Sequence, residues 1–299
     1  MFQQKQYYLH MKYIIYLITY PFLWCISILP FPLLYLLSDF IFIIVYHIIG
    51  YRTKTVRENM ALTLTHLSEK ERYIIEKKFY HHLCDLFLEM IKTMTISKEE
   101  ICKRYVFKNI EVYKEIEKKE KSIAIMCAHY ASYEWAISLN YHSKYKSYGI
   151  YKKISNDYFD KLVHKIRSKF KAILITTKET IPTIINNNNN NILSVYGFAS
   201  DQSPKANTAF HYAKFMGIEV PVHTGAEMLA KRYNMNVVFL QTKKIKRGYY
   251  EASIELLSEN SSEVPNYELT DQFLKLVEKQ IYEAPEYYLW THKRWKHKK

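Results

Sequence analysis

The sequence has 299 residues, of which 48% are apolar, so the chain is long enough for one large domain and an attached segment. Its formal net charge of +14 predicts a surface that attracts phosphates, anionic lipids or acidic proteins, and nucleic acid also fits that charge. The four cysteines form no CxxC pair, which argues against a zinc site or a redox dithiol. No glycine-rich phosphate loop is present, so we expect no nucleotide, and we predict no metal or other cofactor.

Residues 13–49 form an almost uncharged apolar stretch, interrupted only by Asp39, His47 and the prolines Pro21, Pro30 and Pro32. It runs well beyond the apolar core of a signal peptide, which has about 7 to 15 residues. Each half is at the short limit of about 17 residues for crossing a bilayer. Two interpretations stay open. Either one tilted helix spans the membrane, or the central prolines fold two short helices into a hairpin within one leaflet.

This stretch divides the chain into a predicted membrane anchor at 1–50 and a second domain at 51–299. The second part lacks another apolar span, so we expect a soluble domain that contacts the phospholipids at the membrane surface. Basic residues flank both ends of the anchor, and the positive-inside rule therefore does not select its orientation cleanly. We predict the cytoplasmic face of a cell membrane for the larger domain.

Helical and strand patterns then alternate along the chain. A helical region at 53–98 includes the capping-box sequence SEKE, which begins at Ser68. Apolar runs predict strands at 122–127, 172–175, 192–196 and 237–240, and helical spacing predicts helices at 133–139, 225–233 and 270–282. The asparagine run at 186–191 is expected to form an exposed loop without function. The alternation predicts an α/β fold with a mixed central sheet flanked by helices.

His129 falls in the turn after the predicted strand 122–127, and Glu134 follows five residues later, which gives an HxxxxE motif. Residues five apart in one continuous helix would point about 140° from each other. With His129 in the turn and Glu134 in the first helical turns, the carboxylate could reach back to one imidazole nitrogen. The other nitrogen could then accept a proton from an alcohol, as general-base catalysis requires. The alternative is an ordinary turn histidine beside a surface glutamate.

Cys127 supports a rival chemistry, because strand alternation puts its thiol on the same side as His129. The thiol could form an acyl-enzyme, as in Cys-His catalysts. We favour a structural cysteine, since an apolar strand raises the pKa of a thiol and keeps it inert.

The end of the chain, 292–299, is basic, and Trp290 and Trp295 lie in and beside it. In a soluble protein this pattern is compatible with a nucleic-acid arm. Beside a membrane anchor, a better interpretation is interfacial aromatic rings with cations near anionic head groups. A docking patch for an acidic carrier protein fits equally well.

Several blocks in the correct order resemble the lipid A secondary acyltransferase family, of the lauroyl or myristoyl type. They include the sequence after the anchor, the helix with Asp85 and Glu89, the HxxxxE motif and the C-terminal signature from Pro285 to Lys296. Between them lie Tyr151-Lys152-Lys153 with Asn156 and Arg167, then Asp201-Gln202, Phe215-Met216-Gly217 and the segment Gly225 to Ala230. Lys152-Lys153 stands where the family pattern has an arginine-proline pair, which puts the exact substrate in doubt more than the reaction.

The resemblance implies a fold like that of glycerol-phosphate-type acyltransferases and a bacterial inner-membrane location. It implies catalytic roles for His129 and Glu134 and substrate-binding roles for Arg167 and Asp201. The acyl donor would be an acyl carrier protein thioester, and the acceptor a hydroxyl of a phosphorylated glycolipid, a lipid A precursor, with no nucleic acid involved. Alternatives are a membrane-associated thioesterase or hydrolase, an acyltransferase for another phosphoglycolipid, and a non-enzymatic basic membrane protein.

Overall fold

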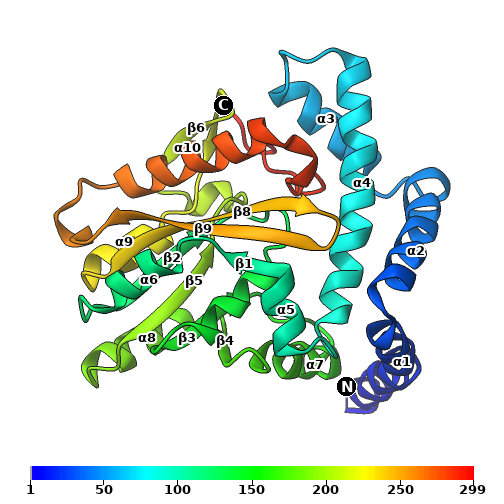
Figure 1. Cartoon of the computed structure of the whole chain (residues 1–299), viewed down its shortest axis with the longest axis horizontal. Coiled ribbons are helices and arrows are strands. Elements are labelled where there is room, and N and C mark those ends of the chain that lie inside the picture. Colours follow the sequence, from blue (N-terminus) through cyan, green and yellow to red (C-terminus); the bar gives the residue numbers. More distant parts are fainter. Residues whose placement is uncertain (1) are drawn as a thin grey trace.

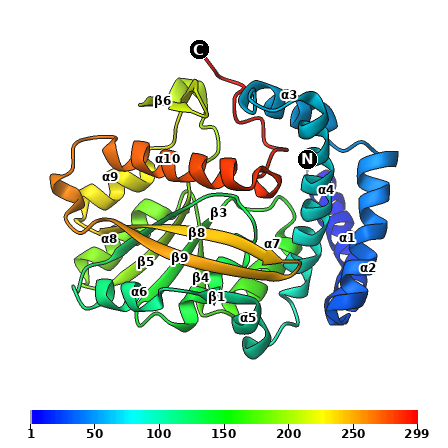
Figure 2. The same ribbon diagram turned by 45° about the horizontal axis from the view of Figure 1, so that its top comes forward.

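The computed structural model describes residues 2–299, so only Met1 of the predicted anchor lies outside it. A seven-stranded mixed sheet forms the centre, and helices pack on its two sides (Figure 1). The predicted α/β class is therefore confirmed. The two apolar N-terminal helices lie beside the sheet domain and pack against the long helix α4 (Glu69–Lys92) (Figures 1 and 2).

The apolar N-terminal stretch is divided into two helices, α1 (Phe2–Ile28) and α2 (Phe31–Phe42), and a π-helical turn (Ile43–Ile48) continues α2. Pro30 occupies the N-cap of α2, where its missing N–H costs no helical hydrogen bond. By length and composition, His10–Ile28 and Phe31–Ile48 are both candidate membrane spans. The prolines therefore separate two helices. Two helices are what the hairpin interpretation requires.

The next helices connect the anchor to the sheet. Helix α3 (Thr53–Thr63) precedes α4, and the predicted capping box at Ser68 is confirmed, because Ser68 and Glu71 exchange side-chain and backbone hydrogen bonds. Helix α5 (Lys98–Arg104), strand β1 (Tyr105–Phe107) and helix α6 (Ile110–Glu117) lead to the central strand. Thr93 ends α4 with a hydrogen bond back to the Glu89 carbonyl, at 3.0 Å.

The sheet has the strand order β1-β9-β8-β2-β5-β3-β4. All pairs are parallel except the hairpin of β8 and β9. The strands of this sheet not yet given bounds are β2 (Ile123–Cys127), β3 (Lys146–Tyr151), β4 (Ala172–Thr176), β5 (Ser194–Ala199), β8 (Asn236–Lys246) and β9 (Tyr249–Ser258). The four strands predicted from apolar runs are thus confirmed, with β2 near the middle, where a continuous apolar run is required.

The remaining helices cover the sheet. The longer ones are a 3₁₀ helix (Trp135–Tyr141), α7 (Asp157–Ser168), α8 (Thr180–Asn189), α9 (Gly225–Arg232) and α10 (Glu268–Glu283). Three short 3₁₀ helices lie in the connections, at Ala206–Thr208, Ser261–Glu263 and Pro285–Tyr287. Helix α10 lies on one side of the β8–β9 hairpin, and α5 and α6 lie on the other (Figures 1 and 2). A small separate hairpin of β6 (Tyr212–Phe215) and β7 (Ile218–Pro221) contacts the C-terminal end, where the Lys299 N–H donates to the Glu219 carbonyl at 3.1 Å.

The asparagine run was wrongly predicted to be an exposed loop, because α8 extends through Asn189. The helical period turns Asn187 inward, where it is 3% exposed. Its amide donates to the hydroxyl oxygen of Tyr196 at 2.9 Å, so the buried polar group is satisfied. Low sequence complexity therefore did not prevent one asparagine from joining the core.

The two C-terminal tryptophans were predicted to lie at a membrane interface, but both rings are buried in the fold. Trp290 is 0% and Trp295 is 3% exposed. The Trp295 ring stacks on Phe215 with centroids 5.8 Å apart, and its indole N–H donates to the Phe215 carbonyl. The aromatic residues are core, while the lysines at 293, 296, 298 and 299 remain on the surface.

Candidate active site

Strand pairing places His129 beside Asp201. Strands β2 and β5 are parallel neighbours, and their last paired residues are Cys127 and Ala199. His129 and Asp201 each lie two residues beyond that pair, and the carboxyl ends of parallel strands meet at one edge of the sheet. The imidazole Nδ1 lies 2.7 Å from Asp201 Oδ1, and the His129 backbone N–H donates to the same oxygen at 3.1 Å.

This pair is asymmetric in exposure. The Asp201 side chain is 1% exposed, whereas the His129 side chain is 21% exposed. Burial opposes protonation of His129, but the charge and hydrogen bond of Asp201 and the charge of Glu134 outweigh it, so the pKa of His129 is raised. Burial likewise opposes ionisation of Asp201, and the charge and hydrogen bonds of His129 outweigh it, so the pKa of Asp201 is lowered. The geometry therefore stabilises imidazolium next to a carboxylate.

Glu134 does not make the contact that the motif predicted. Its carboxylate binds the guanidinium of Arg167, with Nη2 at 2.7 Å from each oxygen and Nε at 3.1 Å from Oε2. The reason is local structure, because the residues after His129 form a turn and a 3₁₀ helix rather than the predicted α-helix at 133–139. Glu134 lies in that turn and faces Arg167, in the last turn of α7.

The structure therefore gathers the four predicted site residues, but in a different pairing. Asp201, which was expected on the substrate side, contacts the imidazole, and Glu134, which was expected to hold the imidazole, contacts Arg167. The side chains of Arg167 and Glu134 are 23% and 13% exposed, so this ion pair is partly open to solvent. In the sequence, His129 and Asp201 each follow a predicted apolar strand, which is a signal that both lie at the edge of the sheet. Their contact could not be predicted from this signal, because it also requires the two strands to be neighbours.

The turn of residues 129–134, called the catalytic turn below, is held from the C-terminal segment. The Ala131 N–H donates to the Tyr287 carbonyl at 2.9 Å, and the Leu289 N–H donates to the His129 carbonyl at 3.2 Å. Ala131 has φ +48°, an uncommon conformation for a residue with a side chain. These contacts hold the C-terminal signature next to the motif, although the two segments are far apart in sequence.

Cys127 lies on the strand side of this site. Burial, with Asp201 nearby, raises the pKa of its thiol to about 12. Its sulfur lies 3.7 Å from the Phe198 carbonyl. This environment favours an inert thiol, as expected for a cysteine at the end of an apolar strand. Among residues 2–299, no group of three or more His, Cys, Asp or Glu side chains is arranged to hold a metal ion.

A partly exposed histidine bonded to a buried aspartate at the carboxyl edge of an α/β sheet is chemically suited to accept a proton from a hydroxyl group. Residues 1–297 match the profile of the bacterial lipid A biosynthesis acyltransferase family. The chain belongs to this family, and it is an acyltransferase. A search of curated proteins found none that matches the chain.

Proposed function

We propose that the protein transfers a fatty acyl chain from an acyl carrier protein thioester to a hydroxyl of a lipid A precursor. Family membership supports the acyltransferase class and a lipid A precursor as acceptor. The observation that carries the mechanism is the His129–Asp201 contact at 2.7 Å. The net charge of +14 suits a phosphorylated acceptor and an acidic carrier protein.

In this mechanism, His129 Nε2 accepts the proton of the acceptor hydroxyl while the oxygen attacks the thioester carbonyl. Asp201 holds the Nδ1–H tautomer and stabilises the imidazolium that forms. The C–O bond forms, the C–S bond breaks, and His129 returns the proton to the leaving thiolate. The same proton is thus accepted and then returned at one nitrogen, Nε2 of His129.

The catalytic turn supplies donors for the oxyanion intermediate. In the described part of the chain, the backbone N–H groups of Ser132 and Tyr133 donate to no protein acceptor. Free amides beside the general base are suited to a developing negative charge. Their position supports the turn, rather than an α-helix N-terminus, as the oxyanion-stabilising element.

Arg167 and Glu134 act on the substrate side as a pair. Nε and Nη2 of Arg167 bind Glu134, which leaves Nη1 for an acceptor phosphate. Glu134 orients this guanidinium, and its charge adds to that of Asp201 in raising the pKa of His129. Glu134 therefore supports the base from a distance.

The enzyme works at a bacterial inner membrane with its sheet domain on the cytoplasmic face. Helix α2 buries Phe31, Leu34 and Phe42, while Leu36 and Phe40 on its other side are 67% and 59% exposed. An apolar exposed face opposite a packed face suits a helix that lies against lipid. This arrangement favours the hairpin interpretation, in which α1 and α2 enter one leaflet.

The test is turnover of an acyl carrier thioester with a phosphorylated disaccharide lipid acceptor, using purified protein in detergent or vesicles. His129→Ala is expected to lower the rate by about 10² to 10⁴, the usual contribution of a general base. His66→Ala, at an exposed site away from His129 and Asp201, is the matched control.

A His129→Ala protein that keeps more than about a tenth of the turnover would contradict the general-base role. Release of free fatty acid from the thioester at the same rate with and without acceptor would instead favour a hydrolase. Retention of every secondary acyl chain in lipid A from cells lacking the gene would contradict the acceptor assignment.

A further inference from the structure

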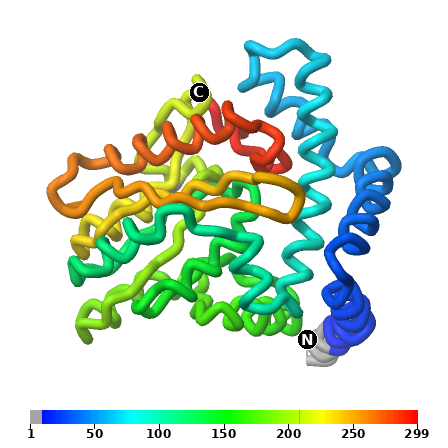
Figure 3. The backbone as a smooth tube through the Cα atoms, in the orientation of Figure 1, coloured from blue at the N-terminus to red at the C-terminus, as the bar shows by residue number. Residues whose placement is uncertain are grey.

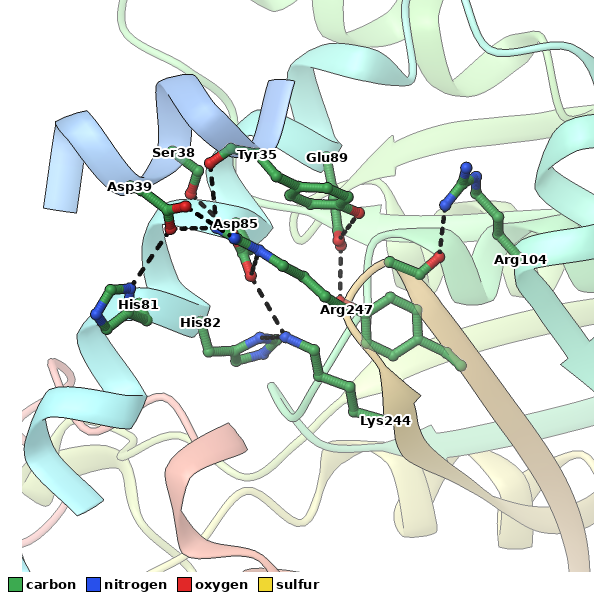
Figure 4. Close-up of polar contacts among 12 residues, drawn as sticks. Tyr35, Ser38, Asp39, His81, His82, Asp85, Glu89, Arg104, Lys244 and Arg247 are labelled. Atoms are coloured by element: carbon green, nitrogen blue, oxygen red, sulfur yellow. Dashed lines mark hydrogen bonds and ion pairs between the residues drawn. The ribbon is translucent and has the colours of Figure 1, made fainter. Parts of the chain in front are cut away.

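The tip of the β8–β9 hairpin lies beside helix α4, and its Arg247 side chain reaches both α4 and the N-terminal helix α2 (Figures 3 and 4). Arg247 at this tip donates from Nη2 to Asp39 of α2 at 2.6 Å and to Asp85 of α4 at 2.7 Å. Gly248 follows with φ +73°, and a Cβ there would lie 2.0 Å from the Tyr35 hydroxyl oxygen. A side chain at position 248 would therefore clash with the Tyr35 ring and would also require a strained backbone conformation.

A second set of contacts continues from Asp85 to Lys244 and His82 (Figure 4). Lys244 Nζ lies 3.5 Å from Asp85 Oδ2 and donates to His82 Nδ1 at 3.1 Å. All three residues are buried, and His82 is 3% exposed. Asp85 and Glu89 on this helix were noted in the sequence, but the proposed mechanism does not use them.

The contact with Lys244 fixes the tautomer of His82. An ammonium group can only donate hydrogen bonds, so Nδ1 must be the nitrogen that accepts. Burial and then the charge of Lys244 lower the pKa of His82 well below its ordinary value, which keeps the ring neutral. The single ring proton is therefore on Nε2.

This Nε2–H group lies behind the catalytic turn. The His82 ring packs edge-on against Tyr287, with centroids 4.9 Å apart, and its imidazole interacts with the Ala131 backbone. The Tyr287 carbonyl accepts the Ala131 N–H, so both contacts reach the backbone of the same residue. Nε2 is buried, yet no acceptor in the described part of the chain lies at full hydrogen-bond geometry. Hydrogen bonds at catalytic sites are often long before substrate binds and tighten in the complex.

We propose that His82 is a positioning residue for the catalytic turn, donating from Nε2 to the Ala131 backbone in the tautomer that Lys244 selects. The proposal rests on the proposed function, because the turn carries the base His129. Asp85 and Arg247 connect this pair to Asp39, so docking of α2 and the geometry of the turn depend on each other.

The test compares three replacements of His82 in the full-length protein, with kcat and KM measured in the acyl-transfer assay. His82→Phe keeps a ring against Tyr287 but has no donor. His82→Gln places an amide N–H near the position of Nε2, whereas His82→Asn places its amide near Nδ1, toward Lys244. We expect Phe and Asn to lower kcat by about tenfold with little change in KM, and Gln to restore most of that loss.

A packing role predicts the opposite order, with Phe better than Gln. The proposal is therefore overturned if His82→Phe has the kcat of the wild type, or if folded His82→Gln is no better than His82→Asn. Circular dichroism checks the fold, and the Gln and Asn pair decides the question if the Phe protein fails to fold. His129→Ala is measured in parallel. Loss of turnover in that protein, together with full turnover in His82→Phe, would reject the positioning role alone, whereas turnover in His129→Ala would reject the proposed function.

Discussion

Asp201→Asn tests whether the carboxylate next to the imidazole is catalytic. The substitution keeps the side-chain shape, and the amide oxygen can still accept the two hydrogen bonds now made at 2.7 and 3.1 Å. What it removes is the negative charge that stabilises the imidazolium. We expect the turnover rate to fall by about 10² to 10⁴, in the range found for general bases and their orienting carboxylates.

The pH dependence gives a second, independent readout. His129 must be neutral to act as a base, and its raised pKa places the acid limb of kcat/KM above the ordinary histidine value. Without the Asp201 charge, the pKa of His129 falls, so the acid limb moves to lower pH. Glu134→Gln should move the limb less, because the charge of Glu134 is the smaller contribution to that pKa.

The same pair affects stability. The raised pKa of His129 contributes stability that is complete below its unfolded value of about 6.5, while the lowered pKa of Asp201 contributes above about 3.9. The destabilisation by Asp201→Asn should therefore be greatest between these pH values, and thermal unfolding at pH 5 and pH 8 measures it. In the pH profile of kcat/KM, an acid limb that stays in place in Asp201→Asn but moves in Glu134→Gln would refute the assignment of Asp201 as the carboxylate that stabilises the His129 imidazolium.

Two further predictions concern buried groups. Cys127→Ser should keep at least about half of the turnover, since the thiol pKa of about 12 makes it inert, and complete loss in a folded protein would restore the acyl-enzyme route. Glu89 is 0% exposed, and burial raises its pKa to about 7, so its charge costs up to about 3 kcal/mol above that pH. Glu89→Gln should therefore raise Tm at pH 8 but not at pH 4, and an unchanged Tm at pH 8 would contradict this.

Local patterns predicted those parts of the fold that local physics decides. The strand at 122–127 could be identified because it is a continuous apolar run, and its neighbours on both sides bury it. The capping box at Ser68 depends on residues three apart, so it too was readable. The 3₁₀ helix at Trp135–Tyr141 was not, because the Tyr287 and Leu289 segment, distant in sequence, shapes the turn before it.

In the site as well, local sequence predicted the features that depend on nearby residues, but not those that depend on distant segments. His129 was identified from its place after a strand, but its partner depends on β5 lying next to β2, which a single sequence does not specify. Glu134 was assigned by sequence proximity, and proximity was misleading, since Asp201 is 72 residues away and closer in space. The predicted location of Trp290 and Trp295 was wrong for a related reason. Composition alone cannot distinguish a tryptophan at a membrane interface from one that packs in the core.

The two N-terminal helices are packed into the fold of the enzyme. Helix α2 contributes Phe31, which packs edge-on to Trp135 with centroids 6.3 Å apart, at the start of the 3₁₀ helix that follows the catalytic turn. Lys92 of α4 donates to the carbonyls of Ser27 and Leu29, and so holds the bend between the two anchor helices. Packing of α2 and of this bend against α4 therefore also supports the 3₁₀ helix that follows residues 129–134, so the N-terminal helices take part in shaping the structure around His129.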